Sequence, residues 1–144
     1  MHVKFFIATD HAGVSIKSDV IVMLQNMGHE VVDLGPFNDE RVDYPDFAHL
    51  VAQEVLAHEG TQGILICGSG IGMSLAANKH AGIRAALCND IYTAQMARAH
   101  NDANILCFGQ RIVGIGLIEA ILKSWCTTPF EGGRHACRVA KIEV

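Results

Sequence analysis

A cysteine followed by a glycine-rich loop is the feature of this sequence that is best suited to chemistry. Cys67 ends an apolar run and is followed directly by Gly68-Ser69-Gly70-Ile71-Gly72. Glycines let the backbone approach a ligand closely, and a helix that begins after such a loop offers unpaired N–H groups that favour an anion. The same groups favour a thiolate, so Cys67 could act as a base or as a nucleophile. The alternative is a tight turn in which glycine only solves a packing problem.

The loop must also be compared with the dinucleotide-binding fingerprint. That fingerprint reads Gly-x-Gly-x-x-Gly, whereas the spacing here is Gly-x-Gly-x-Gly. Asp90 does lie about 20 residues farther on, where a ribose-binding acid is expected. We rank a nicotinamide cofactor below a small anionic ligand, because the glycine spacing differs.

Histidines and aspartates provide further candidates at the ends of predicted elements. Asp10 and His11 follow the first apolar run, and His100 closes a helical segment. Together with Cys67 they could bind a metal, but no pair among them has i, i+4 spacing, and we expect no metal site. Five other histidines have no nearby partner in the sequence, and we expect most of them to be solvated. These are His2, His29, His49, His58 and His80.

Two arginines near the C-terminus have helical spacing. Arg134 and Arg138 are four residues apart. A helical turn there would place both guanidinium groups on one face, from which they could bind a phosphate. An ordinary solvated tail is the alternative.

The segments that must position these residues alternate between short β-branched runs and longer helical patterns. We expect strands at residues 3–9, 30–34, 63–67, 83–88 and 103–108, and helices at residues 14–27, 44–59, 71–79, 91–100 and 115–125. This alternation predicts an α/β fold, a three-layer αβα sandwich with a five-stranded parallel, Rossmann-like sheet.

Ligands in such folds bind beyond the carboxyl ends of the strands. Three strand ends are therefore of interest, namely those followed by Asp10-His11, by Cys67–Gly70 and by Gly109–Arg111. If the first and third strands are neighbours, the first two of these loops face one crevice.

Composition limits the classes of protein to consider. The chain has 144 residues, half of them hydrophobic, and we expect one domain over residues 1–144. A formal net charge of −4 argues against a nucleic-acid or anionic-membrane surface. The sequence shows neither a membrane-spanning run nor a signal peptide. Its five cysteines lack Cys-x-x-Cys spacing, which favours a reducing cytoplasm over disulfides or zinc.

Several segments, taken in order, resemble one family. It is the sugar-phosphate isomerase family that holds the type B ribose-5-phosphate isomerases and the galactose-6-phosphate and allose-6-phosphate isomerases. The segments are residues 9–13 (TDHAG), 43–48 (DYPDFA), 63–74 (GILICGSGIGMS), 76–79 (AANK), 82–86 (GIRAA), 100–104 (HNDAN) and 128–135 (TPFEGGRH).

The resemblance implies an aldose–ketose isomerase that interconverts ribose 5-phosphate and ribulose 5-phosphate, a step of the non-oxidative pentose phosphate pathway. The reaction would proceed by ring opening and by proton transfer through a cis-enediolate. The cysteine that matches Cys67 is the base. The histidine that matches His100 opens the furanose ring and reaches the site across a dimer interface. One branch of the family uses a glutamate instead of this cysteine, and the corresponding position here is Met73.

The resemblance also implies the other site residues. Ser69 keeps the hydroxyl of a threonine found in many relatives and is expected among the catalytic residues. Residues expected to contact the substrate are Asp10, His11 and Asn101, the anion-binding loop of Gly68, Ser69, Gly70, Ile71 and Gly72, and the phosphate contacts Arg111, Arg134 and Arg138. The C-terminal segment 126–144 would contribute to the phosphate site and to the interface.

The same resemblance implies a homodimer, or a dimer of dimers, that needs neither a metal nor an organic cofactor. Three alternatives stay open at this point. One is an isomerase of allose or galactose 6-phosphate, another is a phosphosugar-sensing or structural subunit without turnover, and the third is a nicotinamide-binding module.

Overall fold

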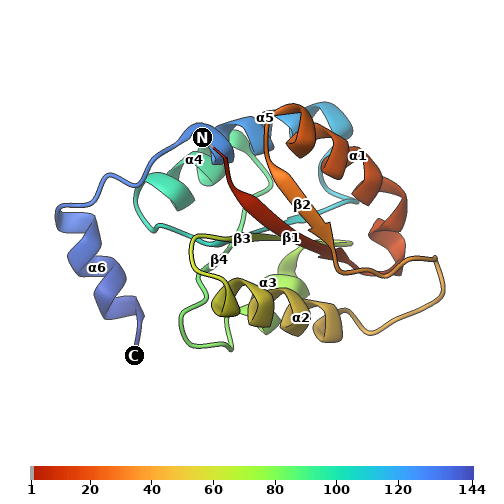
Figure 1. Ribbon diagram of the computed structural model, residues 1–144, viewed down its shortest axis with the longest axis horizontal. Helices are drawn as coiled ribbons and strands as arrows, with labels where there is room; N and C mark the ends of the chain where they lie inside the picture. Colours follow the sequence, from red (N-terminus) through yellow and green to blue (C-terminus); the bar gives the residue numbers. More distant parts are fainter. Residues whose placement is uncertain (1) are drawn as a thin grey trace.

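The computed structural model describes residues 2–144 and is organised around one parallel sheet (Figure 1). The strands are β1 (Lys4–Thr9), β2 (Glu30–Asp33), β3 (Gln62–Cys67), β4 (Ala85–Leu87) and β5 (Ile105–Gly109). Their order is β2-β1-β3-β5-β4, and every neighbouring pair is parallel. The predicted α/β fold is therefore confirmed, and the first and third strands are neighbours.

Helices cover both faces of the sheet. They are α1 (Val14–Asn26), α2 (Tyr44–Ala57), α3 (Ile71–Ala77), α4 (Ile91–Ala99), α5 (Ile115–Thr127) and α6 (Arg134–Ile142), and a short 3₁₀ turn, η1 (His11–Gly13), precedes α1. Helices α2 and α3 lie on one face, whereas α1, α4 and α5 lie on the other (Figure 1). Helix α6 stands apart from both layers, at one end of the molecule. Among the described residues, the helices are too short or too polar to cross a membrane.

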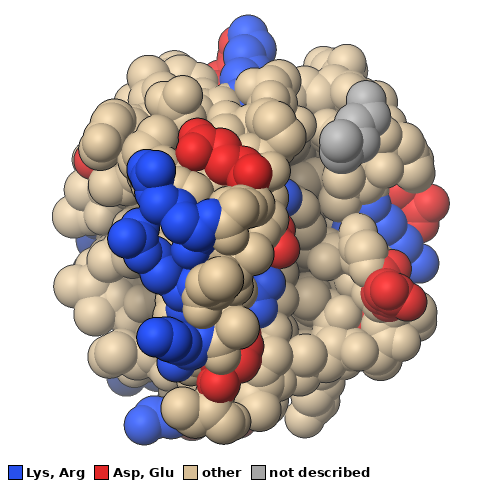
Figure 2. All heavy atoms as spheres, turned by 90° about the vertical axis from the view of Figure 1, so that its left-hand side faces the viewer, with Lys and Arg blue, Asp and Glu red and all other residues tan. Residues whose placement is uncertain are grey.

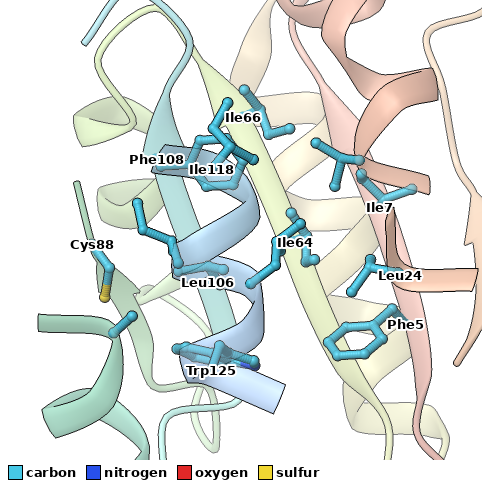
Figure 3. Packing of buried hydrophobic residues seen from close by; sticks show 14 of the residues in the cluster. Phe5, Ile7, Leu24, Ile64, Ile66, Cys88, Leu106, Phe108, Ile118 and Trp125 are labelled. Atoms are coloured by element: carbon cyan, nitrogen blue, oxygen red, sulfur yellow. The ribbon is translucent and has the colours of Figure 1, made fainter. Parts of the chain in front are cut away.

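Alternation along each strand divides the core into two clusters. In β3, Ile64 and Ile66 pack toward α1 and α5, while Leu65 and Cys67 pack toward α2 and α3. Figure 3 shows the first cluster, in which Trp125 of α5 lies over the sheet. Because both faces are covered, β1 is apolar from Phe5 to Ala8 and β3 is apolar from Gly63 to Cys67. The alternation of side chains along β3 thus places Cys67 on the face of the sheet that α2 and α3 cover.

Two expected elements are shorter than the sequence pattern predicts. Helix α3 ends at Ala77, because the Asn78 side chain donates to the Ala85 carbonyl (2.9 Å) and accepts from the Ala85 N–H (2.8 Å). Strand β4 begins at Ala85 rather than at residue 83, because the Ile83 N–H bonds to the His80 carbonyl in a turn.

The expectation that isolated histidines are solvated is wrong at three positions. His29 is buried, and its Nδ1 accepts the Val3 N–H (3.1 Å). Burial is the main cause that lowers the pKa of His29. His49 and His80 are half-buried and hydrogen-bond to each other, Nδ1 to Nε2, at 2.6 Å. These partners lie too far away in the sequence for a local pattern to show.

The helix–sheet packing of the first cluster can be tested with a matched pair of leucines. Leu24 of α1 is fully buried, whereas Leu56 of α2 is 48% exposed. We predict that Leu24→Ala lowers the free energy of unfolding by about 2–5 kcal/mol, because it leaves a cavity. Leu56→Ala should change it by less than about 1 kcal/mol. Urea denaturation measures both values, and equal losses would contradict the assigned packing.

Candidate active site

A cleft lies at the carboxyl edge of the sheet, between the ends of β1 and β3. Thr9 and Ile66 are register partners, so the loops that follow these two strands start side by side. Strand order reverses at this point, because β2 lies beyond β1 and β5 lies beyond β3. The reversal point of an open α/β sheet is where ligands bind. The cleft has a volume of about 690 Å³. It is lined by Asp10, His11, Ala12, Tyr44, Cys67, Gly68, Ser69, Ile71, Gly72, Leu75, Arg111 and Ile112.

Cys67 lines this cleft, and its sulfur has a hydrogen-bond donor. The residue is 5% exposed, and its Sγ accepts the Gly70 N–H at 3.1 Å. Gly70 has φ = 80°, and a Cβ there would lie 2.7 Å from the Phe108 carbonyl carbon. Only glycine fits this close approach and this conformation. Packing therefore explains why residue 70 is a glycine, which was the alternative to a chemical role. The same packing directs the Gly70 N–H toward the Cys67 sulfur.

Three other cysteines, of which Cys88 and Cys107 are buried and Cys126 is half-buried, differ from Cys67 in their surroundings. Burial raises the pKa of Cys88 and of Cys126 to about 11. Burial also raises the pKa of Cys107 far above the usual range. These three thiols stay protonated at neutral pH and lie outside the cleft lining.

The loop between β3 and α3 offers donors to an anion. The first backbone hydrogen bond of α3 runs from the Ser74 N–H to the Gly70 carbonyl. The N–H groups of Gly72 and Met73 precede that bond, so the helix itself provides no acceptor for them. Ile71 N–H is committed to Ser69 Oγ at 3.2 Å, which leaves the Ser69 hydroxyl proton free to donate elsewhere.

Arg111 brings a positive charge to the same loop. The backbone N–H of Arg111 donates to the Gly68 carbonyl (3.1 Å), and this hydrogen bond connects the end of β5 to the glycine loop. A Cβ placed on Gly68 would lie 3.7 Å from Nη1 of Arg111. The guanidinium therefore rests against the loop, where it can pair with a phosphate.

Asp10 and His11 are held by backbone hydrogen bonds. Asp10 Oδ1 accepts the Gly13 N–H at 2.9 Å and caps η1. His11 Nδ1 accepts the Val42 N–H at 3.3 Å. A ring nitrogen that accepts cannot carry the proton, so the neutral His11 ring carries it on Nε2 and can donate from there. Both side chains line the cleft.

The remaining predicted residues lie elsewhere in the chain. His100 caps the C-terminus of α4, before β5 begins, and Asn101 follows it. The register pairs Cys67 with Gly109 at one end of β5 and Gly63 with Ile105 at the other end. Four residues of strand span roughly 13 Å, so His100 and Asn101 are at the opposite edge of the sheet from Cys67.

Arg134 and Arg138 are on the same far side of the molecule. Both are exposed on α6, which confirms the helical turn that their spacing predicted. Figure 1 shows the β1 and β2 arrows pointing away from α6. Figure 2 shows basic side chains forming a stripe on the face where α6 lies. The expected residue set is thus split within one chain, and His100, Asn101, Arg134 and Arg138 do not enter its Cys67 cleft.

Some lining residues were absent from the sequence-based set. Tyr44 packs on the glycine loop, because a Cβ on Gly72 would overlap the Tyr44 ring. The segment containing Tyr44 was among those that carried the family resemblance. Leu75 and Ile112 are exposed apolar residues at the cleft, and no sequence signal separates them from core positions.

Comparisons with known proteins show the family to which the chain belongs. A family model described as Ribose/Galactose Isomerase matches residues 5–142. Ribose-5-phosphate isomerase B of Escherichia coli is 47% identical over 139 residues, which cover 96% of this chain and 93% of that protein.

Solved structures are similar in fold and in sequence. A ribose-5-phosphate isomerase B of Clostridium thermocellum superposes with a TM-score of 0.94 at 49% identity and covers 97% of this chain and 95% of its own. The type B enzyme of Trypanosoma brucei gives a TM-score of 0.95 at 49% identity, with 99% and 97% covered. The chain therefore belongs to the ribose/galactose isomerase family.

Proposed function

We propose that this chain interconverts ribose 5-phosphate and ribulose 5-phosphate, with Cys67 as the base that moves a carbon-bound proton. The observation that carries the proposal is the setting of the Cys67 sulfur. It lies in the cleft at the strand-order reversal and accepts the Gly70 N–H, and the neighbouring loop residues Gly68, Ser69 and Gly72 line the same cleft. A relative named ribose-5-phosphate isomerase B matches this chain over nearly its whole length, which supports the choice of a pentose phosphate.

The proton transfer follows from this arrangement. The Cys67 thiolate removes the proton from C2 of the open-chain aldose and returns it to C1, through a cis-enediolate, while the proton of the C2 hydroxyl moves from O2 to O1. Negative charge develops on the substrate oxygens in the transition state. Within the loop from Gly68 to Gly72, the Gly72 N–H, which has no acceptor in α3, and the Ser69 hydroxyl are placed to stabilise that charge, and such donors typically contribute roughly 3–4 kcal/mol each. We expect the reaction to need neither a metal nor an organic cofactor.

Ring opening and phosphate binding need residues from a second copy of the chain. His100 and Asn101 lie at the sheet edge opposite the cleft, and Arg134 and Arg138 lie on α6 at the same end of the molecule. In a homodimer, these residues of each chain could enter the Cys67 cleft of the other chain, and the dimer would then have two complete sites. Arg111 would then contact the phosphate from one side, and Arg134 and Arg138 of the partner subunit would contact it from the other. The segment 126–144 contributes both the phosphate contacts and part of the interface in this arrangement.

The cysteines fit a reducing compartment. All five are free, and three are buried. We propose the cytoplasm as the place where this enzyme works.

Replacing the base tests the mechanism. We predict that Cys67→Ala lowers kcat by about 10²- to 10⁴-fold, which is the range for a positioned general base, while binding of ribose 5-phosphate persists. Steady-state kinetics and calorimetric titration measure the two effects. Cys88→Ala is the matched control and should keep its activity, because Cys88 is buried away from the cleft. Ordinary turnover by Cys67→Ala would remove Cys67 from the mechanism.

A second variant separates ring opening from proton transfer. We predict that His100→Asn lowers kcat/KM on cyclic ribose 5-phosphate far more than on an analogue that lacks the 4-hydroxyl. This analogue cannot close a furanose ring and so needs no ring opening. The rates of ketose formation from both compounds provide the comparison. Equal losses would mean that His100 has a different role.

A further inference from the structure

His100 is packed against a second histidine. The rings of His100 and His135 are stacked, with their centroids 4.1 Å apart and their planes 8° from parallel. The Glu131 Oε1 atom lies 3.8 Å from Nε2 of His100 and 3.4 Å from Nε2 of His135. His135 is 6% exposed, although it belongs to a helix whose other residues are mostly open to solvent. All three side chains come from one chain.

The segment between Glu131 and His135 is shaped to make this contact. The Glu131 N–H donates to the Ala99 carbonyl at 2.9 Å, which fastens the segment to the end of α4 beside His100. Gly132 and Gly133 follow with φ of 69° and 56°, and Gly133 has ψ of −128°, a conformation that residues with a Cβ avoid. The chain reverses there, and α6 begins with His135 directed back onto the His100 ring.

The charges around the pair favour one neutral ring. Burial is the first cause that lowers the pKa of His135, followed by the charges of His100, Arg134 and Arg138, whereas Glu131 acts in the opposite direction. His135 is therefore neutral near neutral pH. Strong repulsion between the two rings would require both to be imidazolium ions. A neutral His135 ring can therefore stack on His100 in either protonation state of His100.

A metal ion is a weaker explanation for the same cluster. The candidate ligand atoms of His100, Glu131 and His135 all lie within 4.8 Å of one another. Imidazole lone pairs lie in the ring plane, however, and the planes here are nearly parallel. Both rings would have to rotate and break the stack before their nitrogens could share one ion.

We propose that His135 and Glu131 are positioning residues for His100 in ring opening, and this rests on the proposed function of His100. Ring opening breaks the C1–O4 bond, forms the C1 carbonyl and moves the anomeric hydroxyl proton to O4. A histidine that takes the first proton and delivers it to O4 is an imidazolium in between. The stacked His135 ring holds the plane of His100, and the Glu131 carboxylate stabilises that imidazolium.

Two substitutions at His135 test the stacking role. His135→Ala should lower kcat/KM on ribose 5-phosphate roughly tenfold, about the contribution of one aromatic pair, and should leave the 4-deoxy analogue nearly unaffected. His135→Phe restores a ring to stack against and should retain most of the activity. If His135→Phe is as impaired as His135→Ala, or if both substrates lose equally, the positioning role is overturned.

A substitution at Glu131 tests the charge. Glu131→Gln keeps the shape of the side chain and should show the same selective loss on the cyclic substrate. The matched control is Glu119→Gln on α5, where the carboxylate pairs with Lys123 on the surface, and it should behave as the unmodified enzyme. Unchanged kinetics for Glu131→Gln would overturn the role of Glu131.

A measurement that does not require turnover separates this inference from the proposed function. Histidine side-chain NMR spectra of the full chain should show His100 ring protons shifted upfield by the His135 ring, and His100→Asn assigns those signals. The shift should disappear in His135→Ala and persist in His135→Phe. Its absence from the unmodified protein would overturn the inference. If the shift is present but the protein has no isomerase activity, the stack is structural only, and the failure lies in the proposed function.

Discussion

The parallel pairing of β1 with β3 is the constraint on which the rest of the site depends. It brings the residues after Thr9 and after Ile66 to one edge of the sheet, at the reversal of strand order. Asp10, His11 and Cys67 share a cleft because of that pairing. If another strand lay between β1 and β3, the same residues would be separated along the carboxyl edge of the sheet and would not share one cleft.

The glycine loop turns this placement into a chemical environment. Gly70 packs against Phe108 of β5 so closely that a side chain would not fit, and that packing directs its N–H to the Cys67 sulfur. Gly109 is equally constrained, since a Cβ there would lie 2.6 Å from the Gly68 carbonyl oxygen. The packing of Gly70 and the hydrogen bond to the Cys67 sulfur therefore have the same structural cause, so a packing role for the glycine does not exclude a chemical role for the loop.

Much of the fold could be predicted from the sequence because its signals are local. The apolar runs of β1 and β3, the helix spacing and the residue types at the strand ends all act over a few positions. The strand order was beyond this reasoning, because it depends on contacts between distant segments. The hydrogen bond between His49 and His80 could not be predicted for the same reason, because the two residues are 31 positions apart.

The candidate site was predictable as a set of residues and less so as an arrangement. Cys67, Asp10, His11 and Arg111 come together as expected. His100 and the α6 arginines lie at the other edge of the sheet, and only the family resemblance indicated that they would act across an interface. The stacking of His135 on His100 depends on the chain reversal at Gly132 and Gly133. No periodic pattern in the sequence predicts this stacking.

The central claim is that each site combines Cys67 of one chain with the His100 edge of another. Mixing the two inactive variants Cys67→Ala and His100→Asn under conditions that exchange subunits tests it directly. A mixed dimer would hold one site with both native residues, so an equal mixture should recover about a quarter of the unmodified activity. If subunits exchange and the mixture stays as inactive as its components, each chain carries its own complete site and the shared-site account is wrong.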